Sequence, residues 1–290
     1  MWNDKLDVIE VFGGEGKWAL QGEGMFTGVP STFIRTFGCN LACKFGLTDD
    51  PMLAESYERQ IRSYPTHFPN KTLEELPVYD KFCDTYYSIF PEYAKYAKTY
   101  SVDELTDYVY SLCKDYNDRA HLIFTGGEPL LPLNQEFYIK FLQAVHTKCN
   151  VKHVSFETNT TQALIPDFED SSFVPKISFS MSPKLSSAGY SIAENCYPDV
   201  VWQYIEFSKK HEGHSWFKFV VSKKSDIDEI FEYLKHAYVE NKIPVYLMPA
   251  GGTKKELDYH SELVYDLCAK YGFRFSSRLQ VSVKDNGIGI

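Results

Sequence analysis

The chain contains 290 residues and carries a formal net charge of −9, with 44% hydrophobic and 24% charged residues. The acidic balance argues against broad binding to nucleic-acid phosphates, and the composition excludes a disordered chain. No apolar run is long enough for a transmembrane helix, and residues 1–10 lack the apolar core of a signal peptide, so we expect a cytoplasmic protein. The seven cysteines, without an export signal, favour metal or redox use over disulfides. The 21 Tyr and 21 Phe residues are a second unusual feature, and aromatic residues are densest between residues 86 and 100.

Hydrophobic patterning predicts an α/β fold. Short apolar runs bounded by Gly or polar residues predict strands at residues 7–12, 31–37, 121–125, 153–156, 176–180, 216–221, 244–248 and 278–283. Longer amphipathic runs predict helices at residues 101–116, 135–148, 198–210, 226–239 and 255–271. Ser101 and Glu104 form a capping-box pattern at the start of the first helix. The alternation of strands and helices is typical of a mainly parallel sheet.

One stretch interrupts this alternation. Residues 45–100 are polar and aromatic, contain five prolines and show weak periodicity. Such a length is unusual for a connection inside a compact domain. Within this stretch, we interpret only residues 71–76 as helix-like.

Six short motifs follow predicted strands. In a parallel sheet the carboxyl ends of the strands share one edge, and ligands bind there. Each motif alone is typical of a turn, but their common position indicates a ligand site. The motifs are Gln-Gly-Glu-Gly at 21–24, Gly-Cys-Asn-Leu-Ala-Cys at 38–43, Gly-Gly-Glu-Pro at 126–129, Glu-Thr-Asn at 157–159, Ser-Pro-Lys at 182–184 and Met-Pro-Ala-Gly-Gly at 248–252.

Cys39 and Cys43 follow the second predicted strand with three residues between them. Such a pair is either part of a metal site or two buried free thiols. Three thiolates on an iron–sulfur cluster would leave one iron open for a non-protein ligand. A compact cluster loop would place the third cysteine at Gly46, but the next cysteine is Cys83.

These motifs resemble the 7-carboxy-7-deazaguanine synthase family of radical S-adenosylmethionine (SAM) enzymes, of the queuosine and deazapurine pathway. That family reads Gln-Gly-Glu-Gly, then Phe-x-Arg-x-x-Gly-Cys-Asn-Leu-x-Cys-x-aromatic-Cys-Asp-Thr. Here the pattern runs through residues 33–45 and resumes at Cys83-Asp84-Thr85, which implies an insertion of about residues 46–82 in the cluster loop. The other matching segments are 21–24, 101–105, 125–130, 157–159, 182–184, 278–281 and 286–290.

The resemblance implies one radical SAM domain over residues 1–290, folded as a partial, open β/α barrel. It implies a lyase that converts 6-carboxy-5,6,7,8-tetrahydropterin to 7-carboxy-7-deazaguanine with loss of ammonia. SAM would act catalytically through a 5′-deoxyadenosyl radical. The implied cofactors are a [4Fe-4S] cluster, SAM and Mg²⁺. The implied partners are the pterin substrate, an electron donor of the flavodoxin or ferredoxin type and a second copy in a homodimer, without nucleic acid or membrane.

The resemblance also implies roles for individual residues. The cluster ligands would be Cys39, Cys43 and Cys83. SAM would be bound by Phe82, Asp84, Gly126, Gly127, Glu128, Ser182, Pro183 and Lys184. The substrate would be bound by Leu20, Gln21, Gly22, Arg35, Thr125 and the terminal Ile290, and Mg²⁺ by Thr85. Arg35 suits a carboxylate because its guanidinium can pair bidentately.

Several alternatives stay open. Cys196, in a predicted loop, is a rival third ligand, whereas Cys113, Cys149 and Cys268 are assigned to predicted helices. Arg35 could instead form a structural ion pair, and Lys184 could be a solvated loop lysine. Glu15, His153 and Glu157 are near strand ends but could be turn or core polar groups. The alternative functions are a glycyl-radical activase, a degenerate non-catalytic relative, and a zinc protein using the three cysteines and a histidine such as His67.

Overall fold

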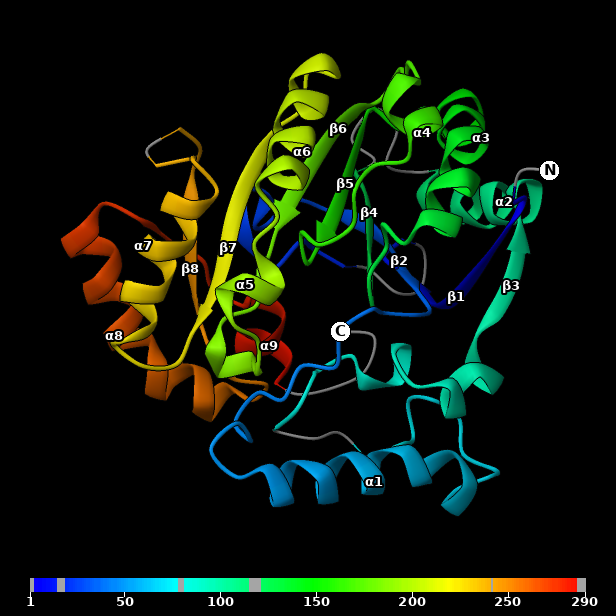
Figure 1. The fold of residues 1–290 in the computed structure, drawn as a ribbon. Helices are drawn as coiled ribbons and strands as arrows, with labels where there is room; N and C mark the ends of the chain where they lie inside the picture. The colour runs from blue at the N-terminus through cyan, green and yellow to red at the C-terminus, as the bar shows by residue number, and fades with distance from the viewer. Residues whose placement is uncertain (1–2, 15–18, 78–80, 115–120, 241, 286–290) are drawn as a thin grey trace.

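A computed structural model describes residues 3–14, 19–77, 81–114, 121–240 and 242–285 (Figure 1). Two candidate site residues, Glu15 and Ile290, lie outside the described residues, as do the motif at 286–290 and the end of the helix predicted to reach residue 116. None of the described helices combines the length and the apolar character that a membrane span needs.

The described strands form one sheet of nine, in the order β3-β1-β2-β4-β5-β6-β7-β8-β9. From β2 to β9 all neighbours are parallel, whereas β1 is antiparallel to both β2 and β3. The predicted α/β fold with a mainly parallel, open sheet is therefore confirmed. The strands are β1 (Lys5–Phe12), β2 (Ser31–Thr36), β3 (Lys98–Ser101), β4 (His121–Gly126), β5 (His153–Thr158), β6 (Lys176–Met181), β7 (Ser215–Val221), β8 (Val245–Pro249) and β9 (Arg274–Phe275).

Helices cover the outer face of the sheet, and the main core lies between the two layers (Figure 1). The outer helices are α2 (Val102–Cys113), α3 (Pro132–Cys149), α4 (Pro166–Asp170), α6 (Pro198–Lys210), α7 (Asp226–His236) and α8 (Lys254–Tyr271). Phe124, Phe156 and Phe179 occupy paired positions on adjacent strands, and their rings stack at 5.0 and 5.8 Å between centroids. Such cross-strand aromatic pairs stabilise a sheet and fix its register. The capping box predicted at Ser101 is also present.

The inner face of the sheet is closed at its amino end by the loop after β1. Phe26 lies in the short 3₁₀ helix η1 (Gly24–Phe26). The centroid of its ring is 4.8, 4.6 and 5.4 Å from the ring centroids of His121, His153 and Trp216. These three residues stand at the beginnings of β4, β5 and β7. Because this end is filled, the space inside the open barrel is left at the carboxyl ends of the strands.

The prediction of a last strand at 278–283 is wrong. Leu279–Lys284 form the helix α9, with Arg278 at its N-cap. Val281 is buried while Val283 is 72% exposed, so the two do not share a face as they would in a strand. The edge position beside β8 is taken by β9, which lies just upstream.

The stretch at 45–100 is more regular than predicted. Its helix is α1 (Pro51–His67), which Asp50 caps by accepting from the amide of Leu53 at 3.0 Å. The prediction of a helix at 71–76 is wrong, because these residues form turns. Pro65 lies inside α1 and only four of its residues are buried, so the sequence of α1 is not typical of a helix. The segment after it contains the 3₁₀ helices η2 (Tyr86–Ser88) and η3 (Pro91–Tyr96), then β3.

A second hydrophobic cluster contains most of the aromatic residues at 86–100, whereas Tyr100 belongs to the main core. The second cluster packs α1 against η2, η3 and the β1 residue Ile9. Tyr93 is fully buried and donates from its hydroxyl to the carbonyl of Ile61 at 2.7 Å. The cluster consists of Ile9, Leu47, Ala54, Ile61, Tyr64, Leu73, Leu76, Phe82, Tyr86, Tyr87, Phe90 and Tyr93. These aromatic residues therefore form the core that holds α1 in place.

Candidate functional site

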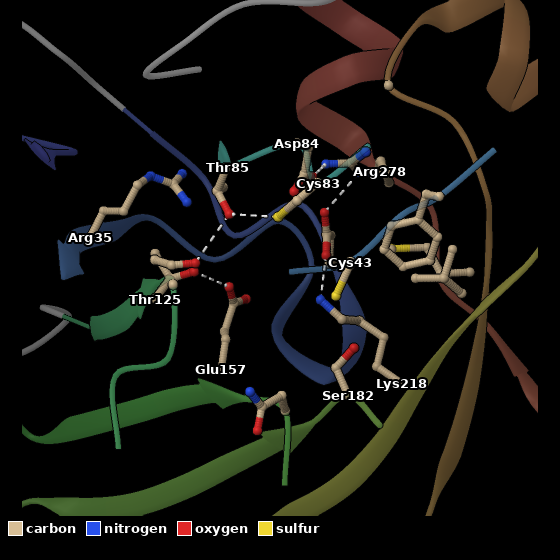
Figure 2. A pocket seen from close by; sticks show the side chains of 18 of the residues that line it. Arg35, Cys43, Cys83, Asp84, Thr85, Thr125, Glu157, Ser182, Lys218 and Arg278 are labelled. Carbon is tan, nitrogen blue, oxygen red and sulfur yellow. Dashed lines mark hydrogen bonds and ion pairs between the residues drawn. The ribbon is translucent and has the colours of Figure 1, made fainter. Parts of the chain in front are cut away.

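A cavity of about 290 Å³ opens at the carboxyl ends of the parallel strands (Figure 2). Residues from all six motifs predicted at strand ends line it. The loop at 21–24 reaches the same place by a different route, because β1 runs antiparallel to its neighbours. The predicted site residues that line the cavity are Leu20, Gln21, Gly22, Arg35, Cys39, Cys43, Phe82, Cys83, Asp84, Thr85, Thr125, Gly126, Gly127, Ser182 and Lys184.

Cys39, Cys43 and Cys83 share this cavity, and Figure 2 shows Cys43 and Cys83 in it. All three thiols are free of disulfides. Burial is the largest cause of a raised pKa for each of them and raises that of Cys39 to about 12. The thiols are therefore protonated at neutral pH unless a bound metal supplies positive charge.

Backbone hydrogen bonds bring the two cysteine segments side by side. The amide of Phe82 donates to the carbonyl of Phe45 at 2.8 Å, and the amide of Gly38 donates to the carbonyl of Ser88 at 2.7 Å. The long loop between Cys43 and Cys83 thus closes on itself, which is inexpensive because loop-closure entropy grows slowly with length.

Glycines make room beside the first cysteine. A Cβ on Gly127 would lie 2.1 Å from the carbonyl oxygen of Gly38 and 2.9 Å from the Cβ of Cys39. Gly126 has φ +129°, a conformation that side chains disfavour. The Gly-Gly turn therefore packs directly against the cysteine loop.

Three thiols that share one cavity are the ligand set of an iron–sulfur cluster with one open iron. Among the described residues, no group of three or more His, Cys, Asp or Glu side chains could hold one metal ion. In a [4Fe-4S] cluster each thiolate binds a different iron, so the ligands stand farther apart than around zinc. His67, the histidine of the zinc alternative, lies in the last turn of α1 and contacts Ser63 at 3.0 Å.

The other four cysteines do not line the cavity. Cys113, Cys149 and Cys268 are buried on α2, α3 and α8, as predicted. Cys196 caps the short helix α5 (Ile192–Asn195), and its Sγ donates to the carbonyl of Tyr233 at 3.9 Å. The position of Cys196 therefore does not support it as the third ligand.

Arg35 both forms an ion pair and faces the cavity, so it combines the structural and the substrate-binding alternatives. It lines the cavity, and its Nε donates to Oε2 of Glu10 at 2.8 Å. Tyr87 donates from its hydroxyl to the same oxygen at 3.2 Å. Among the described residues, neither Nη atom of Arg35 has a hydrogen-bond partner. The guanidinium is thus held by its Nε edge and can present its other edge to an anion.

Glu157 belongs to the cavity rather than to the core. Gln21 donates from Nε2 to Oε1 of Glu157 at 3.0 Å. Thr125 donates from Oγ1 to Oε2 of Glu157 at 2.8 Å (Figure 2). Thr85 lies close by, and its Oγ1 donates to the carbonyl of Gly126 at 3.2 Å. These contacts join residues of three predicted motifs into one polar wall.

Sequence reasoning missed a buried group of charges on the opposite wall. Glu23 accepts from Lys218, from Nε of Arg278 at 3.0 Å and from Nε2 of Gln280 at 2.8 Å. Burial favours protonation of Glu23, but Lys218 and Arg278 outweigh it and hold the pKa of this carboxyl well below its usual value. A signal was available, because Lys218 is a lone charge in the apolar strand β7.

Three of the residues considered for the site do not line the cavity. Glu128 is fully buried and does not line the cavity, and neither does Pro183. The Glu128 carboxylate accepts from the amides of Leu130 and Asn159 at 2.9 and 2.7 Å, so it braces two turns instead of facing a ligand. His153 contacts Phe26 at the amino end of the sheet. Lys184, by contrast, lines the cavity beside Ser182, with 3.2 Å between Nζ and Oγ, and is not a solvated loop lysine.

A family model described as a 4Fe-4S single cluster domain matches residues 20–196, a range that contains Cys39, Cys43 and Cys83. The chain belongs to this family. Like other 4Fe-4S single cluster domain proteins, it therefore carries an iron–sulfur cluster, and the cavity lined by three thiols is the place that fits one.

Proteins named 7-carboxy-7-deazaguanine synthase are similar to this 4Fe-4S single cluster domain protein over almost its whole length. The one from Halobacterium salinarum is 28% identical over 294 residues, which cover 96% of this chain and 90% of that protein. The one from Hyperthermus butylicus is 27% identical, with 97% and 94% covered. The crystal structure of QueE from Escherichia coli is 18% identical with a TM-score of 0.58, covers 94% of this chain and 93% of that chain, and shows the same fold.

The resemblance inferred from the motifs is therefore confirmed. This 4Fe-4S single cluster domain protein is a radical SAM enzyme like 7-carboxy-7-deazaguanine synthase. Such an enzyme uses an iron–sulfur cluster and SAM, a small-molecule substrate and a source of electrons.

Proposed function

We propose that the protein converts 6-carboxy-5,6,7,8-tetrahydropterin to 7-carboxy-7-deazaguanine with loss of ammonia, using SAM catalytically. One observation carries the proposal: the cavity that joins the three cysteines also holds an arginine aimed by Glu10 and a glutamate held by Gln21 and Thr125. Relatives that are similar over nearly the whole chain carry the name of this activity.

Cys39, Cys43 and Cys83 are the proposed cluster ligands. When bound, the cluster and SAM supply the radical that starts the reaction. In this assignment residues 46–82 are an insertion within one radical SAM domain, and the second hydrophobic cluster packs its helix α1 against η2 and η3. The hydrogen bond between Phe82 and Phe45 returns the chain to the site.

The proposed SAM site lies between the Gly-Gly turn and the end of β6. Gly126 and Gly127 line the cavity there, and Ser182 and Lys184 offer a hydroxyl and an ammonium. Phe82, Asp84 and Pro183 complete the assignment implied by the family motifs. Glu128 supports this site only indirectly, because its carboxylate accepts hydrogen bonds from backbone amides.

The proposed substrate site lies between Arg35 and Glu157. The Nη edge of Arg35 suits the 6-carboxylate, since a guanidinium can bind both carboxylate oxygens. The carboxylate of Glu157 is an acceptor for the N–H groups of the heterocycle. The segment from Leu20 to Gly22 offers backbone groups to the ring edge. The hydroxyl of Thr85 is a suitable ligand for Mg²⁺, a hard cation that prefers oxygen.

The direct test is an anaerobic assay of the full chain. The protein is reconstituted with iron and sulfide and incubated with SAM, dithionite, Mg²⁺ and 6-carboxytetrahydropterin, and the products are identified by mass spectrometry. We expect 7-carboxy-7-deazaguanine and ammonia, with SAM recovered and no methyl transfer. An intact cluster without any deazaguanine product would refute the proposed substrate.

A further inference from the structure

The guanidinium of Arg278 joins three separate segments at the cavity, and Figure 2 shows it beside Asp84. Arg278 donates from Nε to Glu23 at 3.0 Å and from Nη2 to Oδ2 of Asp84 at 2.7 Å. Its Nη1 donates to the carbonyl of Gly251 at 2.8 Å. The side chains of Arg278 and Glu23 are 15% and 11% exposed, so their charged hydrogen bond forms largely out of water, where it is strong.

Asp84 places this contact directly beside a cysteine. It follows Cys83 in the chain, and its side chain is 56% exposed. The same short segment is held from the other side by the amide of Phe82 and the hydroxyl of Thr85, which donate to Phe45 and Gly126. Arg278 therefore ties the Cys83 segment to the wall opposite these two contacts.

The anchor of Arg278 is itself rigid. Glu23 also forms a buried ion pair with Lys218 of β7 and accepts from Gln280. The chain of contacts thus runs from a central strand through Glu23 and Arg278 to Asp84. Lysine could not replace the arginine, since a single ammonium cannot reach three acceptors that lie in different directions.

We propose that Arg278 is a positioning residue for the third cluster ligand. Through Asp84 it fixes how Cys83 faces the cavity, and through Glu23 it sets the loop at 21–24 relative to that cysteine. This inference rests on the proposed role of Cys83 as a ligand. Partners that hold a metal ligand in place commonly affect both the affinity and the electronic properties of the site.

The test measures how firmly the cluster is held, not turnover. The full-length protein and its Arg278→Gln variant are reconstituted anaerobically without SAM or substrate. Release of iron to a chelator and the electron paramagnetic resonance spectrum of the reduced cluster are then compared. We expect Arg278→Gln to release iron about tenfold faster and to shift the spectrum.

A matched control is Arg62→Gln. Arg62 forms ion pairs with Glu92 and Glu58 at 2.9 and 3.3 Å, but it lies on α1 and does not line the cavity. Its loss should leave both the release rate and the spectrum unchanged. The iron-release rate of Arg278→Lys should lie between those of the wild type and Arg278→Gln. Lysine keeps the positive charge, but its ammonium cannot donate to all three acceptors.

Asp84→Asn provides a second variant, since a half-exposed carboxylate can be neutralised without disturbing the core. We expect it to speed iron release, and the double variant with Arg278→Gln to add little, because the two residues act through one contact. Should Arg278→Gln fail to fold, Asp84→Asn decides the matter. Wild-type release and an unchanged spectrum in the folded variants would overturn the proposal.

The outcomes separate this inference from the proposed function. A wild-type protein that holds its cluster but forms no deazaguanine refutes the proposed reaction, and the comparison of iron release still stands. An active wild type whose Arg278→Gln variant keeps the same release rate and spectrum refutes the role of Arg278 alone.

Discussion

Glu10 and Arg35 face each other across the antiparallel pair β1 and β2, and the register of the two strands pairs these residues directly. Their side chains are 9% and 13% exposed and form an ion pair of 2.8 Å through Nε of the arginine. The guanidinium carbon also lies 5.7 Å from the ring centre of Phe12 and 5.8 Å from that of Tyr87. The sheet itself therefore orients the arginine that we assign to the substrate carboxylate.

Glu10→Gln should weaken substrate binding more than it slows the chemical step. The amide keeps the shape of the side chain but loses the charge that orients Arg35, and a hydrogen bond to a charged group contributes about 1.5–3 kcal/mol. We expect KM for the carboxylated pterin to rise about tenfold, with a smaller change in kcat. Asp7→Asn, at an exposed position of β1, is the control. An unchanged KM in Glu10→Gln would argue against this arrangement.

Cys83→Ala should lose the cluster, whereas Cys196→Ala should keep it. Cys83 lines the cavity with Cys39 and Cys43, while Cys196 caps α5. Iron and sulfide content after anaerobic reconstitution, with the visible absorption spectrum, measures the difference. The reverse result, with iron retained in Cys83→Ala and lost in Cys196→Ala, would reassign the third ligand.

The buried His121 and the partly buried His153 should make the stability of the protein sensitive to acid. Burial lowers the pKa of His121 to about 3 and that of His153 to about 4, from an ordinary value of 6.5. Both are neutral in the fold, and the unfolded chain binds protons first. Their contribution to stability is therefore complete above pH 6.5 and is lost as the pH falls toward 4 and then 3, by about 1.4 kcal/mol per pH unit for each histidine.

Urea unfolding at several pH values between 4.5 and 7.5 tests this effect. His121→Gln keeps a polar group near the hydroxyls of Ser31 and Ser155 but removes the titration, so its unfolding free energy should fall less steeply with acid. His236→Gln, at an exposed position of α7, should retain the wild-type slope. Equal slopes in all three proteins would contradict the prediction.

Ile61→Ala should lower the free energy of unfolding, because it removes a side chain from the second hydrophobic cluster. Ile61 is a fully buried residue of α1 in the same cluster as Tyr93, and removing a buried isoleucine side chain costs about 2–5 kcal/mol. Met52→Ala on the same helix removes a side chain that is 83% exposed and should cost less than about 0.5 kcal/mol. Urea denaturation followed by tyrosine fluorescence compares the two. Equal effects would mean that α1 does not pack as described.

The sequence was informative wherever local pattern and topology agree. The parallel strands, most of the helices and the motifs after β4, β5 and β6 follow from hydrophobic periodicity. Because the carboxyl ends of parallel strands meet at one edge, those motifs could be placed in one site before their distances were known. The helix α1 could not be predicted in this way, since it buries only a narrow face on a cluster formed by η2 and η3.

Contacts between distant charges required the tertiary structure. Glu23 pairs with Lys218 across 195 positions and with Arg278 across 255 positions, and no local pattern encodes such a partner. The same applies to α9, whose first amide donates to the carbonyl of Gly22 at 3.0 Å. The contact with the loop at 21–24, and not the local sequence pattern, therefore favours a helix at this position.

By itself, the sequence determined the fold class, the family and the residue types around the site, because these depend on periodicity and on motifs that are local in the chain. The tertiary structure decided which cysteine joins Cys39 and Cys43 in the cavity and which charges hold Arg35 and Asp84. It also showed that the carboxylate of Glu128 accepts hydrogen bonds from backbone amides. These relationships depend on how segments far apart in the chain pack, and burial makes each charge depend on the partner that packing brings to it.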